Sequence, residues 1–214
     1  MALRAALFDM DGTIWDSPVD WRDVRRAIGL PQDGRPITEH LESMPPDERA
    51  RGTAILERFE AIGVDQGQPI PGATELLDLL QSRGVLCVLV TNNSRRSAAA
   101  VLRRYPLPFD RVVTRNEGPL KPSPEAFLRP LRDLGVSSAE ALAIGDSHLD
   151  LVSAHSAGIP EIVLVAPKDW IRDLLPRELE FREAKDLFHA AAIVGSLLQP
   201  AGRLSKDEAS RESS

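Results

Sequence analysis

Cysteine is nearly absent from the chain: its 214 residues include only Cys87, so an intrachain disulfide is excluded. One free cysteine fits a reducing compartment, and its place in an apolar run indicates a small core residue rather than a nucleophile. No stretch reaches the ~20 consecutive apolar residues of a membrane helix, and the N-terminus has no signal-peptide layout. These absences together predict a cytoplasmic protein without a membrane partner.

An excess of positive charge is absent as well. The chain carries 26 Lys and Arg residues against 32 Asp and Glu residues, which gives a net charge of −6. Proteins that bind nucleic acid or anionic membranes present basic patches, so the sequence predicts neither as a partner. Hydrophobic residues make up 43% and charged residues 27%, as in soluble globular proteins. The length suits one domain, or one domain with a modest insertion.

Apolar runs and helical patterns alternate along most of the chain. Each apolar run is short and continuous, as in strands that are buried on both faces of a parallel sheet. Glycines and a Ser-Pro-Glu sequence mark helix ends between the runs. The pattern predicts an α/β fold with a doubly wound, Rossmann-like parallel sheet. Strands are expected at 3–8, 85–90, 111–113, 141–144 and 161–165, and helices at 75–82, 95–104, 124–134 and 149–157.

The stretch between Trp15 and Ile70 breaks this rhythm. It contains no strand-like run, and proline, glycine and charged residues are frequent in it. Three of its segments have helical character, so we expect a small helical cap inserted after the first strand. These segments are 20–28, 37–42 and 46–62. The predicted domains are a core at 1–15 and 71–200, the cap at 16–70 and, because it is polar and poor in apolar residues, a disordered tail at 201–214.

Acidic residues cluster where two of the predicted strands end. Asp9, Asp11 and Gly12 follow the first strand, and Asp146 and Asp150 follow the strand at 141–144. Strand-end side chains two residues apart point to one side, so Asp9 and Asp11 can share a pocket. Gly12 lets the backbone approach a bound anion closely. Two carboxylates ~4 Å apart repel by ~4 kcal/mol at an effective dielectric of 20, so the cluster favours a cation. Its oxygen ligands suit Mg²⁺ rather than zinc.

Groups that can hold phosphate follow other strand ends. Thr91 and Asn92 come after the strand at 85–90 and offer a hydroxyl, amides and backbone N–H groups to phosphate oxygens. Lys121 lies just before a helix, where flanking prolines stiffen the backbone, and it supplies a positive charge. With Asp9 and Asp11, these are the parts that phosphoryl transfer through an aspartyl intermediate requires.

Four motifs resemble those of the haloacid dehalogenase superfamily. They are DMDGT at 9–13, VTNN at 90–93, KPSP at 121–124 and GDSHLD at 145–150, in that family's order and with its spacing. The insertion resembles the helical caps of phosphoglycolate-phosphatase-like and phosphoglucomutase-like members. The resemblance implies a Mg²⁺-dependent phosphatase that acts on a small-molecule phosphate ester. A monomer or a homodimer is expected.

The resemblance also implies catalytic roles. Asp9 looks like the nucleophile that carries the phosphoryl group. Asp11 resembles the general acid/base, which protonates the leaving oxygen and later activates water. Thr91 and Lys121 resemble the groups that hold the phosphate and neutralise the surroundings of the nucleophile. These four residues are therefore the expected catalytic set.

Four metal ligands are implied in the same way: Asp9, Asp11, Asp146 and Asp150. Asp9 would bind Mg²⁺ through its carboxylate and Asp11 through its backbone carbonyl. Asp146 looks like a direct ligand. Asp150 resembles either a ligand through water or a support for Lys121.

The second acid of the DxD pair distinguishes the chemistries of this superfamily. Dehalogenase-type members lack it because a halide leaves without a proton, whereas an alkoxide leaving a phosphate ester needs one. Phosphonate-cleaving relatives use a cap lysine instead, and the insertion contains no lysine. A sugar-phosphate mutase with the same core residues stays open as an alternative. So do a non-catalytic phosphate-binding member and a signalling receiver domain, although the DxD pair, the insertion and GDSHLD argue against the receiver.

The insertion of about 55 residues is short for a helical bundle and predicts a more open site. Most of its charged residues are expected to be solvated. The candidates for substrate contact within it are Arg22, His40, Arg49 and Arg51. Three residues near its start could equally line the substrate entrance or pack the cap against the core: Trp15, Asp16 and Trp21.

Overall fold

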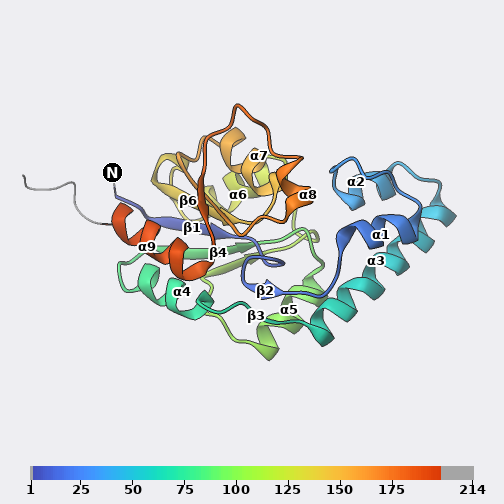
Figure 1. Ribbon diagram of the computed structural model, residues 1–214, viewed down its shortest axis with the longest axis horizontal. Helices are drawn as coiled ribbons and strands as arrows, with labels where there is room; N and C mark the ends of the chain where they lie inside the picture. The colour runs from blue at the N-terminus through green and yellow to red at the C-terminus, as the bar shows by residue number, and fades with distance from the viewer. Residues whose placement is uncertain (1, 199–214) are drawn as a thin grey trace, which may run out of the picture.

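Six short strands form one parallel sheet at the centre of the molecule (Figure 1). The computed structural model describes residues 2–198. Every neighbouring pair in this sheet is parallel. This confirms the predicted α/β, doubly wound fold. In the order in which they lie across the sheet, the strands are β5 (Arg111–Val113), β4 (Leu86–Val90), β1 (Ala5–Phe8), β6 (Ala141–Gly145), β7 (Glu161–Val165) and β8 (Arg182–Ala184).

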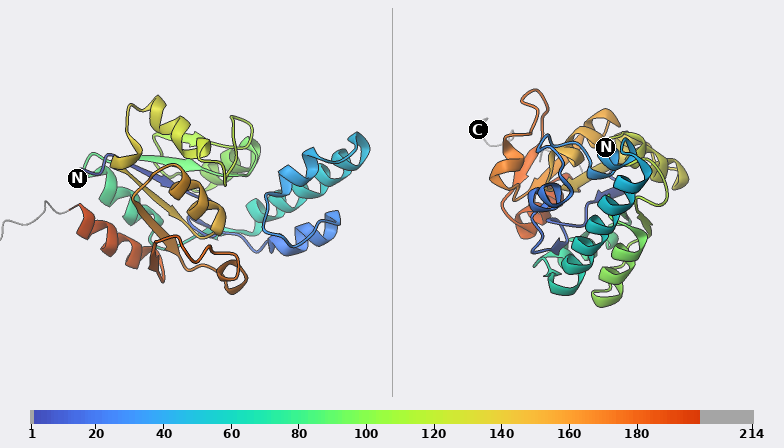
Figure 2. Two further views of the ribbon diagram at one scale, coloured as in Figure 1. Left: turned by 90° about the horizontal axis from the view of Figure 1, so that it is seen from above. Right: turned by 90° about the vertical axis from the view of Figure 1, so that its right-hand side faces the viewer.

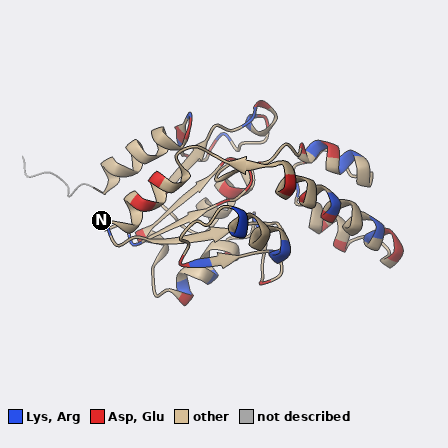
Figure 3. Cartoon of the chain, turned by 90° about the horizontal axis from the view of Figure 1, so that it is seen from below, with Lys and Arg blue, Asp and Glu red and all other residues tan. Residues whose placement is uncertain are grey.

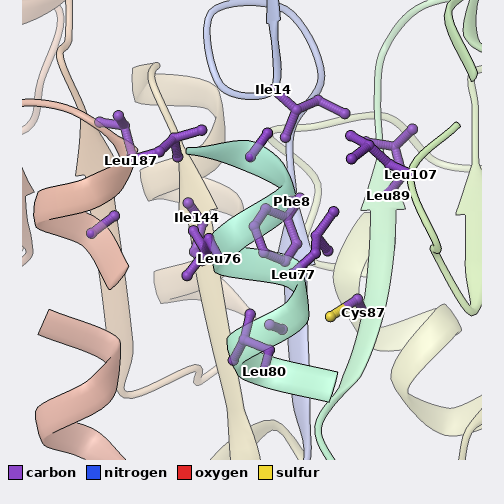
Figure 4. Packing of buried hydrophobic residues seen from close by; sticks show 14 of the residues in the cluster. Phe8, Ile14, Leu76, Leu77, Leu80, Cys87, Leu89, Leu107, Ile144 and Leu187 are labelled. Atoms are coloured by element: carbon purple, nitrogen blue, oxygen red, sulfur yellow. The ribbon is translucent and has the colours of Figure 1, made fainter. Parts of the chain in front are cut away.

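Helices cover both faces of this sheet (Figure 2). One face packs against α4 (Ala73–Gln81), α5 (Arg95–Arg104) and α9 (Leu187–Leu197), and the other against α6 (Glu125–Asp133) and α7 (His148–Ser156). Figure 4 shows the first layer, where leucines of α4 pack with Phe8 and Ile144. Because side chains alternate along a strand, Leu7 belongs to the opposite layer. The continuous apolar runs therefore serve two cores. Two further elements are short helices: the 3₁₀-helix η1 (Ser138–Glu140) and the α-helix α8 (Asp169–Arg172).

The chain reverses its direction across the sheet at β1. It passes outward from β1 through β4 to β5, then returns to β6 on the other side of β1 and continues to β7 and β8. The register places Phe8 opposite both Leu89 and Ile144, so these three strands end at the same edge. Ligands of doubly wound sheets bind at such a switch point, beyond the carboxyl ends of the strands.

The insertion after β1 folds as three helices, which lie at one end of the molecule (Figures 1 and 2). A small apolar cluster that includes Val24, Leu41 and Leu56 joins them, and the helices contain charged residues of both signs (Figure 3). The antiparallel strands β2 (Trp15–Asp16) and β3 (Gln68–Pro69) connect them to the sheet domain. The expected absence of strands here was wrong, because two-residue strands leave no periodic pattern. The helices are α1 (Trp21–Ile28), α2 (Ile37–Glu42) and α3 (Pro46–Gln66).

The sequence analysis did not predict the C-terminal elements β8 and α9. The edge strand β8 contains Arg182 and Glu183, which are exposed, so it lacks the apolar run that marks the other strands. The helix α9 packs against α4 and follows that strand directly. Among residues 2–198, no helix is both long enough and apolar enough to span a membrane. The tail predicted at 201–214 lies outside the described residues.

Candidate active site

The carboxyl ends of β1, β4 and β6 bring Asp9, Thr91 and Asp146 to one edge of the sheet. The backbone N–H of Asp9 donates to the carbonyl of Ile144 at 2.9 Å, so the strand pairing continues to the first acid. Lys121 reaches the same place from the loop after β5. These four residues, Asp9, Thr91, Lys121 and Asp146, line one cavity of about 350 Å³.

Lys121 is buried between two carboxylates. Its Nζ lies 2.5 Å from Oδ1 of Asp9 and 2.6 Å from Oδ1 of Asp150. The other oxygen of Asp150 accepts hydrogen bonds from the backbone N–H (3.1 Å) and the hydroxyl (2.6 Å) of Ser147, at the start of α7. Both oxygens of Asp150 are therefore engaged, one of them with Lys121. Asp9, Asp146 and Asp150 each offer a carboxylate oxygen within 4.8 Å of the others.

Gly12 allows Asp146 to pack against the backbone of the first motif. Its φ is +82°, a left-handed conformation that favours glycine. A Cβ at this position would lie 2.1 Å from Oδ2 of Asp146. At Gly145 a Cβ would lie 2.3 Å from Cγ of Asp150. The backbone approach expected at Gly12 therefore involves a carboxylate of the protein, and a side chain there would displace Asp146.

Asp11 is held by an asparagine of the VTNN motif. Asn93 donates from Nδ2 to Oδ2 of Asp11, whereas Asn92 directs its amide to the backbone of Lys121. Both atoms of the Asn92 amide are used there: Nδ2 donates to the carbonyl at 2.8 Å and Oδ1 accepts from the N–H at 3.0 Å. The expected contact of Asn92 with phosphate stays a prediction. The two-residue spacing that pairs Asp9 with Asp11 also relates Thr91 to Asn93, and this signal could have identified Asn93.

Burial raises the pKa of three carboxyl groups in the site. Desolvation raises the pKa of Asp11 to about 7, and repulsion from Asp9 adds to the shift. Desolvation also raises the pKa of Asp9 to about 6, although Lys121 opposes it, and it raises the pKa of Asp146 well above the ordinary value. Burial alone would lower the pKa of Lys121, but the carboxylates beside it outweigh that effect and raise it. The site therefore contains more acid than one lysine neutralises.

The carboxylate oxygens of Asp9, Asp146 and Asp150 suit a hard divalent cation as ligands. They lie close enough to share one ion. Burial, and then repulsion from neighbouring carboxylates, raises the pKa of Asp9 and of Asp146, so a bound cation would stabilise their charged forms. Asp9 and Asp146 are the residues expected to hold it, because Asp150 is already engaged with Lys121 and Ser147.

Asp11 is expected to make the protein's stability depend on pH when divalent cations are removed. A carboxyl group whose pKa is raised on folding binds its proton more tightly in the folded state, so its contribution is lost as pH rises through the folded pKa. For Asp11 the window runs from the ordinary 3.8 to about 7. In EDTA, Asp11→Asn should therefore gain stability relative to the wild type between pH 5 and 7, by about 1 kcal/mol per pH unit.

Calorimetric Tm values of the two proteins in EDTA would measure this difference. Comparison with the variant is needed because other groups titrate in the same range. The raised pKa values of Asp9 and Asp146 give a slope of the same sign, whereas burial lowers the pKa of His148 from 6.5, which gives the opposite slope. Carboxylates with lowered pKa, such as Glu125, act only near or below their ordinary 4.5 and contribute little here. A difference in Tm that does not change with pH would contradict the prediction.

The insertion forms one wall of the cavity, but with other residues than those expected. Arg25, Arg35 and Glu60 of the insertion line it, with Lys168 and Trp170 from the chain after β7. The four substrate-contact candidates, Arg22, His40, Arg49 and Arg51, do not line it. Three of them have other partners: Arg22 pairs with Asp20, His40 with Asp33, and Arg49 donates to carbonyls that include those of Leu41 and Glu42. No sequence pattern distinguishes the arginines of the insertion that line the cavity from those that do not. The first group is Arg25 and Arg35, and the second includes Arg22, Arg49 and Arg51.

Both roles considered for the start of the insertion occur, in different residues. Trp15 is buried, and its Nε1 donates to the carbonyl of Gly63 at 2.9 Å, so it packs the insertion against the core. Asp16 and Trp21 line the cavity instead. His148 and Gly34 also line the cavity, and His148 Nε2 lies 2.7 Å from the carbonyl of Gly34. The short insertion therefore contacts the core at Trp15 and at His148.

Comparison with known proteins agrees with this geometry. A model of the haloacid dehalogenase-like hydrolases matches residues 3–158. A haloacid dehalogenase-like hydrolase domain-containing protein of Arabidopsis thaliana is 30% identical over 159 residues, which are 69% of this chain and 64% of that protein. An N-acetylmuramic acid 6-phosphate phosphatase of Pseudomonas aeruginosa is 28% identical over 220 residues, covering 84% of this chain and 94% of that one.

A hydrolase from Pseudomonas syringae, one of the similar solved structures, superimposes with a TM-score of 0.74 at 21% identity. The match covers 92% of this chain and 100% of that one, and it shows a shared fold. The family match at 3–158 includes all four motifs, and residues of these motifs meet at one edge of the sheet. The chain therefore belongs to the haloacid dehalogenase-like hydrolase family and is an enzyme.

Proposed function

We propose that this phosphatase hydrolyses small-molecule phosphate monoesters with Mg²⁺, through a phospho-aspartyl intermediate on Asp9. One observation carries the proposal: Asp9 and Asp11 line the same cavity, the first paired with Lys121 and the second with its pKa raised to about 7. A nucleophile and a proton donor are thus side by side. The phosphatase among the similar proteins supports the same reaction.

In the first step an oxygen of Asp9 attacks phosphorus, and the bond from phosphorus to the ester oxygen breaks. Asp11 gives its proton to the leaving oxygen, so an alcohol departs. In the second step Asp11 takes a proton from water, whose oxygen attacks phosphorus and restores the Asp9 carboxylate. Lys121 offsets negative charge throughout, and Thr91 with the backbone N–H of Asn92 binds phosphate oxygens. The Gly12 N–H instead donates to the carbonyl of Trp15 at 2.9 Å. Bound Mg²⁺, held by Asp9 and Asp146, would neutralise charge on the phosphoryl group.

The insertion is proposed to act as the cap that selects the substrate. Its residues share the cavity with those of the core, and caps of this kind exclude water and choose the leaving group. We keep the division proposed from the sequence, with the core at 1–15 and 71–200 and the cap at 16–70. A cytoplasmic location stays a prediction, as does a monomer or homodimer.

Hydrolysis of p-nitrophenyl phosphate with and without Mg²⁺ tests the proposed function. Turnover is expected to require Mg²⁺, to fall to background in EDTA and to return when the metal is restored. The expected reason is that the carboxylate cluster repels a phosphate dianion unless a cation lies between them. Turnover that persists unchanged in EDTA would contradict the metal requirement. A folded protein without turnover on phosphate esters would instead favour a mutase or a non-catalytic role.

A further inference from the structure

Glu60 is a buried acid of the insertion that contacts the core. It lies on α3, which runs beside α5 of the core (Figure 1). Its side chain is 2% exposed, and that of its partner Arg115 is 12% exposed. Oε1 of Glu60 pairs with Arg115 Nη1, and Oε2 accepts from the hydroxyl of Ser94 at 2.8 Å. Both carboxylate oxygens are therefore bound to the core.

These two partners flank the residue that holds Asp11. Ser94 directly follows Asn93, and the backbone N–H of Arg115 donates to the Asn93 carbonyl at 3.0 Å. Asn93 in turn donates from its side chain to Asp11. A continuous set of contacts thus joins the insertion to the second acid of the DxD pair, through the loop after β4.

Attachment of α3 to the core does not depend on Glu60 alone. Trp15 donates to the carbonyl of Gly63, and Arg104 donates to the carbonyl of Val64 at 2.8 Å. A buried ion pair is also a weak source of net stability, because desolvation offsets much of its Coulomb energy. What such a pair supplies is a fixed geometry, here at Ser94 and Arg115.

We propose that Glu60 is a positioning residue for Asp11, acting through Ser94, Arg115 and Asn93. The inference rests on the proposed function, in which Asp11 protonates the leaving oxygen. When the loop after β4 is held, Asn93 keeps the Asp11 carboxyl directed into the cavity. When Glu60 no longer holds this loop, proton transfer from Asp11 to the leaving group is impaired while attack by Asp9 continues.

The test compares two esters that differ in their need for a proton. Phenyl phosphate has a basic leaving group that needs protonation, whereas p-nitrophenyl phosphate has an acidic one that needs it much less. In Glu60→Gln, kcat/KM for phenyl phosphate should fall roughly tenfold more than for p-nitrophenyl phosphate. In an Asp11→Asn background, Glu60→Gln should add no further selective loss, because the group it positions is gone.

Glu57→Gln serves as the matched control, since Glu57 is an exposed acid on the same helix, and it should leave the ratio of the two rates unchanged. The double variant Glu60→Met with Arg115→Met removes both buried charges and should show the same selective loss, so the test survives if the single variant does not fold. Equal loss on both esters in a folded variant, or no loss, overturns the proposal while the proposed function stands. Failure of the wild type on both esters would refute the proposed function itself.

Discussion

An Asp9→Asn variant is expected to lose phosphate-ester hydrolysis by roughly 10⁴-fold or more in kcat. The amide has nearly the same shape as the carboxylate, but it is a poor nucleophile and carries no negative charge. Its Nδ2 or Oδ1 would still lie next to Lys121, which is 2.5 Å from the native carboxylate. Steady-state turnover of p-nitrophenyl phosphate at saturating Mg²⁺ measures the loss, and the Tm shows whether the variant is folded.

Asp16→Asn is the matched control for that variant. Asp16 is an exposed carboxylate that lines the same cavity, so removing its charge changes the electrostatics without touching the nucleophile. Its kcat should stay within a few-fold of the wild type. If Asp9→Asn retained substantial turnover, direct attack by water would replace the covalent intermediate as the mechanism.

A Lys121→Met variant is expected to be both destabilised and nearly inactive. Lys121 is 2% exposed and pairs with Asp9 and Asp150, so its loss leaves the buried Asp150 and the partly buried Asp9 without a counter-charge. Breaking a buried pair in this way costs about 3–5 kcal/mol, which corresponds to a fall in Tm of roughly 10 °C. Loss of a fixed charge beside the reacting phosphoryl group should lower kcat by roughly 10²-fold or more.

Two further variants separate the charge effect from general disruption. Lys168→Met removes an exposed lysine that lines the same cavity and should change the Tm by much less. Adding Asp150→Asn to Lys121→Met removes one of the unpaired charges and should recover part of the lost stability. A Lys121→Met protein in EDTA with a wild-type Tm would show that these carboxylates do not depend on the lysine.

The strands that end at the site were predictable because their signals are local. Each is a short continuous apolar run followed at once by polar residues, and the runs predicted at 3–8, 85–90 and 141–144 correspond to β1, β4 and β6. Parallel strands at a switch point end at one edge, so the residues after them had to meet. The alternation of strands and helices then left few other architectures for the chain.

The sequence alone determined the fold class, the order of the four motifs and the motif residues Asp9, Asp11, Thr91 and Lys121, which line the cavity. Tertiary structure alone decided how these residues pair: that Asp150 binds Lys121, that Asn93 rather than Asn92 holds Asp11, and that Glu60 crosses from the insertion. Each pairing joins residues from separate elements of the chain. Local patterns record which residues form an element, but they contain no information on which side chains of two packed elements will meet.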